Sequence, residues 1–189
     1  HEFEIRKYFH LENGIFVDVG SHIGKYSIMI AKKLKQGKVI AIEADPENFS
    51  SLVKNIKINK LDNIIPVNSA VFSKKGTLKF YKDRATGQNT LLIKKHQKEI
   101  IVKTRTLDEI LKSLKIKKVD LIKMDVEGVE SEVLIGSKVT IKNSPKLRII
   151  FEAWNEDYLE RSNRVLEKLG FEVKQLYKEN YLATKNNNR

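Results

Sequence analysis

Carboxylates and glycines recur where short apolar segments of the sequence end. In the first such place, residues 17–24 (VDVGSHIG), Asp18 precedes Gly20 and Gly24. Glycines allow a tight turn and a close approach to a ligand, and a helix that starts behind them offers free N–H groups. The G-x-x-x-G spacing differs from the G-x-G-x-x-G fingerprint of dinucleotide binding. An acidic residue before the loop suits a cofactor without phosphate that carries an amino acid and a sulfonium, although a plain strand–helix turn uses the same residues.

The second place is Glu43, which ends the apolar run 39–42 roughly twenty residues further on. An acidic residue there can accept hydrogen bonds from the ribose hydroxyls of an adenosine cofactor. A carboxylate at the end of a buried strand is costly unless something binds it. Helix capping is the alternative, but the order of Asp18, Gly20 and Glu43 favours a ligand.

The third place is the segment 123–130 (KMDVEGVE), which follows another apolar run. Catalytic groups of open α/β sheets gather at the carboxyl ends of the strands. Capping of the next helix is the alternative, because acidic residues favour a first helical turn. We expect Glu130 to serve as a first-turn charge and Asp125 and Glu127 to face the cleft. The pair lacks a histidine and a third aligned carboxylate, so we expect no metal.

The elements that position these residues alternate between strands and helices. Strands are predicted at 15–19, 39–43, 64–68, 119–124 and 147–152. Five helices are predicted between or after the strands. The first follows Gly24, with Tyr26, Ile30 and Leu34 on one face and Gly37 as its stop, and the second follows Asp45 and Pro46. The third runs from the capping box 106–109 to Leu114, the fourth follows Gly128, and the fifth covers 157–169 with Gly170 at its end. Such alternation predicts a Rossmann-like α/β fold with a doubly wound, mostly parallel sheet.

Two stretches depart from this alternation. Strands at 77–81 and 100–104 flank a loop at 83–89, and segments 171–176 and 181–184 read as a C-terminal antiparallel hairpin. No linker or repeat divides the chain, so we predict a single domain over 1–189, with a helical lead-in at 1–13 and a frayed tail at 186–189.

The composition of the 189 residues narrows the function classes. Cysteine is absent, which excludes disulfides and thiolate metal sites. The apolar runs are too short to span a membrane, and we expect a cytoplasmic protein. The net charge of +12 could attract RNA. Most of the 36 basic residues are Lys, however, and they are scattered without interleaved aromatic residues, so we do not expect a nucleic-acid partner.

Four segments together resemble the FkbM family of methyltransferases: 17–24, 42–48 (IEADPEN), 106–109 (TLDE) and 120–130 (DLIKMDVEGVE). The similarity runs from about Gly14 to Glu152. It implies a class I methyltransferase fold, S-adenosyl-L-methionine as the methyl donor, and O-methylation of a hydroxyl on a sugar, polyketide or other small molecule. A small-molecule or glycan acceptor is the partner that this resemblance implies.

The resemblance also assigns roles by position. Asp18, Gly20, Ser21 and Gly24 hold the methionine part of the donor, Glu43 with Ala44 holds the ribose, and Asn68, Ser69 and Ala70 lie near the adenine. Asp125 belongs to both the cofactor site and the reaction site. For an alcohol acceptor the base candidates are Glu127, Asp125 and Glu152, ranked above His22 and His96. We expect Trp154 to pack in the core rather than to line an acceptor pocket.

Three other functions remain open. One is an RNA methyltransferase that uses the basic surface, although the Asp-Val-Glu-Gly segment stands where base-modifying enzymes carry an aromatic block. Another is a nicotinamide-dependent oxidoreductase on the same architecture, which the missing G-x-G-x-x-G disfavours. The last is a binding module without catalysis.

Overall fold

Segments rich in β-branched residues form a seven-stranded sheet in the computed structural model, which describes residues 2–82, 89–90 and 98–186. The strands, in their spatial order, are β10 Phe171–Tyr177, β11 Asn180–Lys185, β9 Arg148–Glu152, β8 Leu121–Met124, β1 Asn13–Val19, β2 Gln36–Glu43 and β3 Ile64–Asn68. The five strands from β9 to β3 run parallel, and the β10–β11 hairpin joins β9 antiparallel. The predicted doubly wound sheet with a C-terminal hairpin is confirmed.

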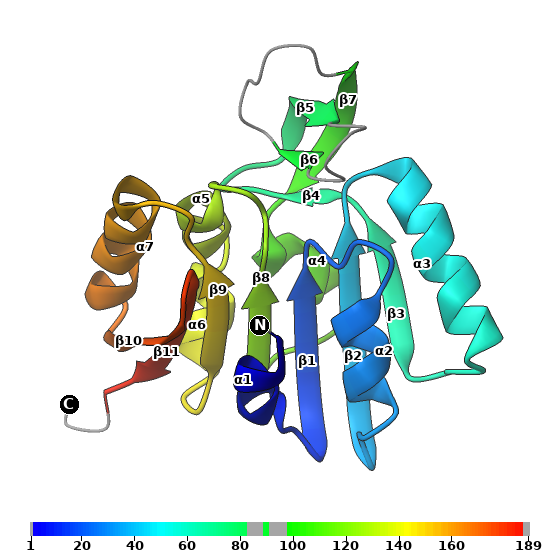
Figure 1. Ribbon diagram of the computed structural model, residues 1–189, viewed down its shortest axis with the longest axis horizontal. Coiled ribbons are helices and arrows are strands. Elements are labelled where there is room, and N and C mark those ends of the chain that lie inside the picture. Colours follow the sequence, from blue (N-terminus) through cyan, green and yellow to red (C-terminus); the bar gives the residue numbers. More distant parts are fainter. Residues whose placement is uncertain (1, 83–88, 91–97, 187–189) are drawn as a thin grey trace.

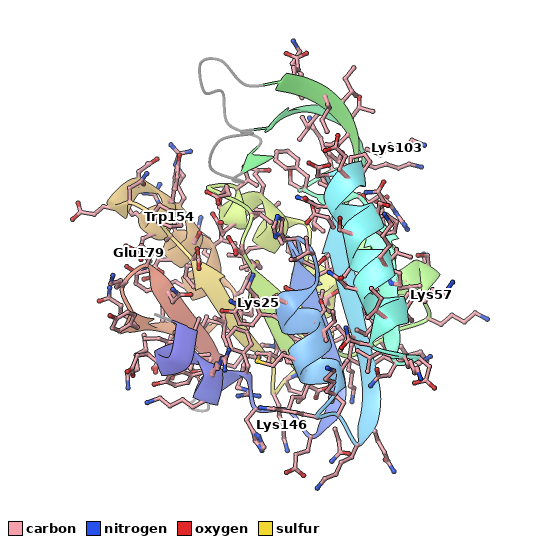
Figure 2. The ribbon with its side chains drawn as sticks, turned by 45° about the vertical axis from the view of Figure 1, so that its right-hand side comes forward. Lys25, Lys57, Lys103, Lys146, Trp154 and Glu179 are labelled. Atoms are coloured by element: carbon pink, nitrogen blue, oxygen red, sulfur yellow. The ribbon has the colours of Figure 1, made fainter. Side chains whose placement is uncertain are left out.

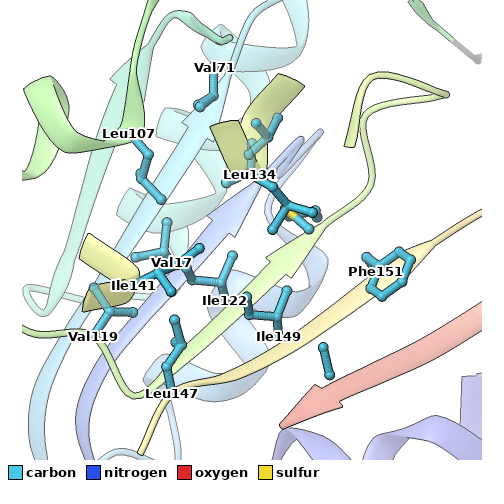
Figure 3. Packing of buried hydrophobic residues seen from close by; sticks show 14 of the residues in the cluster. Val17, Val71, Leu107, Val119, Ile122, Leu134, Ile141, Leu147, Ile149 and Phe151 are labelled. Carbon is cyan, nitrogen blue, oxygen red and sulfur yellow. The ribbon is translucent and has the colours of Figure 1, made fainter. Parts of the chain in front are cut away.

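Helices cover both faces of this sheet. They are α1 Glu2–Arg6, α2 Lys25–Ala31, α3 Pro46–Ile58, α4 Leu107–Ser113, α5 Glu130–Ile135, α6 Lys138–Asn143 and α7 Glu156–Lys168, and a 3-10 turn over Lys7–Phe9 follows α1. Residues of α4 to α7 pack with Val17, Ile122 and Phe151 in one core cluster, part of which Figure 3 shows. Residues of α1 to α3 pack with Phe16 and Leu121 in a second cluster on the opposite face. Successive side chains of a strand point to opposite faces of the sheet, so neighbouring residues such as Phe16 and Val17 pack in different clusters.

Capping residues set the helix starts that the sequence predicts. Asp45 accepts the amide N–H of Glu47 at the start of α3, and Pro46 occupies the first helical position. Thr106 and Glu109 form both bonds of a capping box at the start of α4. Each cap satisfies an amide that would otherwise lack a partner at a helix end.

The helix after Gly24 is shorter than its apolar pattern predicts. It ends at Ala31, so Leu34 lies beyond it, and Gly37 stands inside β2 instead of stopping the helix. Gly37 has φ +137°, and a Cβ there would collide with the backbone of Gly14. The glycine is therefore needed for the close approach of β1 and β2, a requirement that helical periodicity does not reveal.

A second sheet lies beyond the carboxyl ends of the central strands, at the top of Figure 1. It has the order β4 Ala70–Val71, β7 Lys98–Arg105, β5 Gly76–Lys82 and β6 Asn89–Thr90. The predicted pair at 77–81 and 100–104 forms its antiparallel centre, with Leu78 paired to Val102. The predicted loop at 83–89 lies largely outside the described residues. This small sheet stands at the same end of the molecule as the residues to which we assigned chemistry.

No helix within the described residues has the length and apolar character needed to cross a membrane.

Candidate active site

The loop after β1 is a tight turn tied to its neighbours. Gly20, His22 and Gly24 all have positive φ angles, of 76°, 52° and 91°. The amides of Gly20 and Ser21 both donate to the carbonyl of Ile42, each at 3.0 Å. A Cβ on Gly20 would collide with the carbonyl oxygen of Asp125, so only glycine lets the loop lie against the end of β8.

Asp18 lies beneath this loop, with a side chain that is 1% exposed. Its Oδ2 accepts the hydroxyl of Ser27 at 2.6 Å, and its Oδ1 is 3.8 Å from the Nζ of Lys123. Burial raises the pKa of Asp18, and the Lys123 ammonium opposes that rise. Because Asp18 bonds to the first turn of α2 and pairs with β8, it supports the loop from below.

Lys123 brings the first loop and the end of β8 together. Its ammonium is 3.1 Å from Oδ2 of Asp125, which lies just beyond β8. Burial lowers the pKa of Lys123, but the charges of Asp125 and Asp18 outweigh that effect and raise it overall. Lys123 was not among the predicted site residues, although a lysine inside the apolar strand LIKM signals a buried partner.

The carboxylate of Glu43 is held at the end of β2. Its Oε2 accepts the amide N–H of His22 at 2.7 Å and its Oε1 that of Asp45 at 2.9 Å. Burial raises the pKa of Glu43 to about 7, against the opposing effect of these two bonds. Each oxygen keeps a lone pair, so the carboxylate can still accept bonds from a ligand.

The other residues predicted at the cofactor site lie beside Glu43. Asn68, paired with Glu43 across β2 and β3, donates its side-chain amide to the carbonyls of Glu43 and Ala44 at 2.8 and 3.3 Å. Ser69 donates its amide to the Glu43 carbonyl at 3.1 Å and its hydroxyl to the carbonyl of Lys103 at 3.2 Å. Ala70, buried, begins β4. The junction between the two sheets thus passes directly by Glu43.

Glu152, at the end of β9, is surrounded by charge. Burial and the charge of Asp125 raise its pKa, Lys123 lowers it, and the resulting pKa is about 7. The charges of Glu127 and Glu130 also raise it, which places both near Glu152. The structure therefore gathers all three predicted catalytic carboxylates, although they lie on two strand ends.

Glu130 lies in the first turn of α5, as expected, but its carboxylate is buried. It begins α5 but is 1% exposed, and its Oε1 accepts the amides of Val126 and Gly128, each at 3.3 Å. Burial raises its pKa to about 7. Glu130 therefore closes the loop that carries Glu127, whose φ of 56° is left-handed. Glu127 itself is partly exposed, as a residue that meets an acceptor must be.

Trp154 does not pack in the core as we expected. Its side chain is 48% exposed just beyond β9, and Figure 2 shows it at the edge of the molecule, near Glu179. The amide of the preceding Ala153 donates to the carbonyl of Glu179 at 2.9 Å, which fixes the backbone there. Trp154 lies where the chain turns from β9 into α7, outside the core clusters of the described residues. His96 lies outside the described residues.

The chemistry of this edge fits S-adenosylmethionine. Glu43 can accept bonds from ribose hydroxyls, and the carboxylates around Lys123 outnumber its single positive charge, which suits a sulfonium and an ammonium. The hydroxyl of Ser21 is buried and has no hydrogen-bond partner among the described residues. A buried hydroxyl without a partner is expected where a ligand supplies one. Within the same part of the chain, no cluster of three or more acidic or histidine side chains could hold a metal ion.

Comparison with known proteins decides the family. Residues 18–173 match the methyltransferase FkbM domain. The chain belongs to this family. The matched region contains the first loop, the ends of β2 and β8, and Glu152, so it includes the candidate active site described above.

The chain is similar to several proteins that are named as methyltransferases. Methyltransferase sdnD of Sordaria araneosa is 26% identical over 85% of this chain and 74% of its own length. Hexuronic acid methyltransferase AglP of Haloferax volcanii is 30% identical over 66% of this chain and 50% of its own. The crystal structure of a methyltransferase FkbM from Methylobacillus flagellatus superposes with a TM-score of 0.67 at 19% identity, over 92% of this chain and 44% of that one. The chain thus spans about half the length of some of its relatives.

Proposed function

We propose that the chain transfers a methyl group from S-adenosyl-L-methionine to a hydroxyl of a carbohydrate or similar small molecule. The observation that carries this proposal is the convergence of Glu43, Asp125 and Glu152 at the carboxyl ends of three strands, against the left-handed loop after β1. In open α/β sheets this edge is where ligands bind.

We assign the donor site to the residues at this edge of the sheet. We assign the ribose hydroxyls to Glu43 and the amino acid part to the loop 20–24, with Ser21 as a polar contact. Asn68, Ser69 and Ala70 border the adenine position. Asp125 lies between the donor and the reaction site, and Asp18 supports the loop from beneath.

A carbohydrate acceptor is supported by one relative and one exposed side chain. AglP is named for its action on hexuronic acid. Trp154 presents its indole two residues after Glu152, and aromatic faces suit the apolar face of a sugar ring. Figure 2 shows Lys25, Lys57, Lys103 and Lys146 on different parts of the molecule, in keeping with basic residues that are scattered along the sequence.

For methyl transfer from this donor, the protein mainly needs to position the donor and the acceptor and to take up a proton. When bound, S-adenosylmethionine supplies a methyl group on a sulfonium that is already activated. We assign the proton of the acceptor hydroxyl to Glu127 or Glu152, and Glu152 has a pKa of about 7, which suits a base near neutral pH.

The test begins with donor binding and then screens acceptors. Calorimetry should give micromolar affinity for S-adenosylhomocysteine and no binding of NADH; the reverse would identify an oxidoreductase. Methyl-labelled donor is then offered to uronic acids, neutral sugars, hydroxylated metabolites and tRNA. We expect label in the carbohydrate fraction, and labelled tRNA alone would replace the proposal with RNA methylation. An Asp125→Asn variant controls for contaminating enzymes.

A further inference from the structure

Lys123 is a buried cation at a place where the proposed reaction uses a positively charged donor. Its side chain is 7% exposed, and it pairs with Asp125 at 3.1 Å and with Asp18 at 3.8 Å. A buried lysine is expensive in free energy unless its partners repay the loss of solvation. The presence of Lys123 inside the short parallel strand β8 therefore indicates that its charge has a role.

The register of the sheet determines which groups Lys123 reaches. Asp18 on β1 is the direct neighbour of Lys123 on β8, so both side chains project from the same face. That face is covered by α2, where the ring of Tyr26 lies 4.9 Å from the Nζ. Asp18 in turn accepts the hydroxyl of Ser27, also on α2. The ammonium is thus enclosed by β1, β8 and α2 and reaches the edge of the sheet through Asp125.

We propose that Lys123 is a positioning residue for methyl transfer: its ammonium holds Asp18, beneath the loop after β1, and Asp125, beyond β8, in the arrangement that receives the donor. The inference rests on the proposed function. Lys123 does not touch the donor; it acts through the two carboxylates. With it in place, the site keeps an excess of negative charge for the donor while the repulsion among its carboxylates is reduced.

The effect of losing the ammonium follows from the groups that face this cluster. These are Asp18 from β1, Glu43 from β2, Asp125, Glu127 and Glu130 around the β8–α5 loop, and Glu152 from β9. Lys123 lowers the pKa of both Asp18 and Glu152 against the effect of burial. Without it, both groups take up protons at higher pH, and the pH range in which the site binds a cationic ligand moves upward.

The experiment compares Lys123→Met and Lys123→Arg with Lys57→Met, a control at an exposed lysine of α3. S-adenosylhomocysteine, which carries an ammonium group, is titrated by calorimetry between pH 6 and pH 9, and folding is checked by circular dichroism. We expect Lys123→Met to bind at least tenfold more weakly at pH 7, with the loss narrowing toward pH 9. Lys123→Arg should recover most of the affinity, and Lys57→Met should match the wild type.

A structural role alone would lower the affinity of Lys123→Met by the same factor at every pH, and that result, or unchanged affinity, would overturn the inference. If Lys123→Met does not fold, the Asp18→Asn, Lys123→Met double variant removes both charges of the buried Asp18–Lys123 pair. Asp125 and Glu152 still lack the ammonium in it, so a pH-dependent loss that arises from Glu152 is expected, and a loss that is uniform with pH refutes the idea. Should the double variant also fail to fold, Lys123→Arg decides, because wild-type binding supports a requirement for charge and loss of binding in folded protein contradicts it. Failure of the wild type to bind the ligand would instead reject the proposed function.

Discussion

Replacement of Glu43 by Gln separates the cost of this carboxylate to folding from its contribution to binding. The pKa of Glu43 rises from 4.5 to about 7 on folding because the side chain is buried. At 1.36 kcal/mol per pH unit, this rise corresponds to an upper limit of about 3 kcal/mol. Between pH 4.5 and pH 7 the folded protein binds more protons than the unfolded chain, so the free energy of unfolding falls as the pH rises.

Ligand binding should respond to pH in the opposite direction. Ribose hydroxyls donate to the ionised carboxylate, and with a pKa of about 7 Glu43 is roughly one-tenth ionised at pH 6 and nine-tenths at pH 8. The affinity for S-adenosylhomocysteine should therefore rise about tenfold over this range. Loss of the charge-assisted bonds in Glu43→Gln should weaken binding at pH 8 by about ten- to a hundredfold, or about 1.5–3 kcal/mol.

Both quantities can be measured on the same protein. Calorimetry at pH 6, 7 and 8 gives the affinity, and urea denaturation at the same pH values gives the free energy of unfolding. Glu160→Gln, at an exposed side chain of α7, is the matched control; it should leave the affinity unchanged and, because it removes only an exposed ion pair with Arg164, lower the free energy of unfolding by no more than about 0.5 kcal/mol. If folded Glu43→Gln binds with the wild-type affinity and pH dependence, Glu43 does not hold the ribose.

Three further variants test the neighbouring positions. Glu127→Gln should lower turnover of an identified acceptor at least about a hundredfold with nearly unchanged calorimetric affinity for S-adenosylhomocysteine; a wild-type rate would shift the base role to Glu152. Asp125→Asn should lower both affinity and turnover, because its carboxylate anchors the end of β8, and an effect on turnover alone would contradict its place at the donor. Gly20→Ala should lower the free energy of unfolding by at least about 2 kcal/mol in urea, since its φ is 76° and the Cβ would meet the Asp125 carbonyl. Gly170→Ala, with φ +80° and open space, isolates the cost of the backbone angle.

The sequence by itself determined the fold class and the places where chemistry gathers. Alternating β-branched runs and capped helices are local signals, so the parallel strands and the starts of α3 and α4 could be read directly. Asp18, Glu43, Asp125 and Glu152 follow from the rule that functional groups stand at strand ends. Their roles in binding and catalysis stay predictions.

Tertiary structure decided how these residues divide their tasks. Lys123 gains its importance only from the register of β1 against β8, which no local pattern contains. The close approach of β1 and β2 places Gly37 in a strand, and the turn beyond β9 leaves Trp154 exposed instead of buried. Glu130 occupies the first turn of α5 as expected, but the loop that folds onto its carboxylate decides that it is buried. For Lys123 and Gly37 the deciding contact joins strands whose pairing depends on the assembled sheet, whereas sequence patterns report only the preferences of each segment.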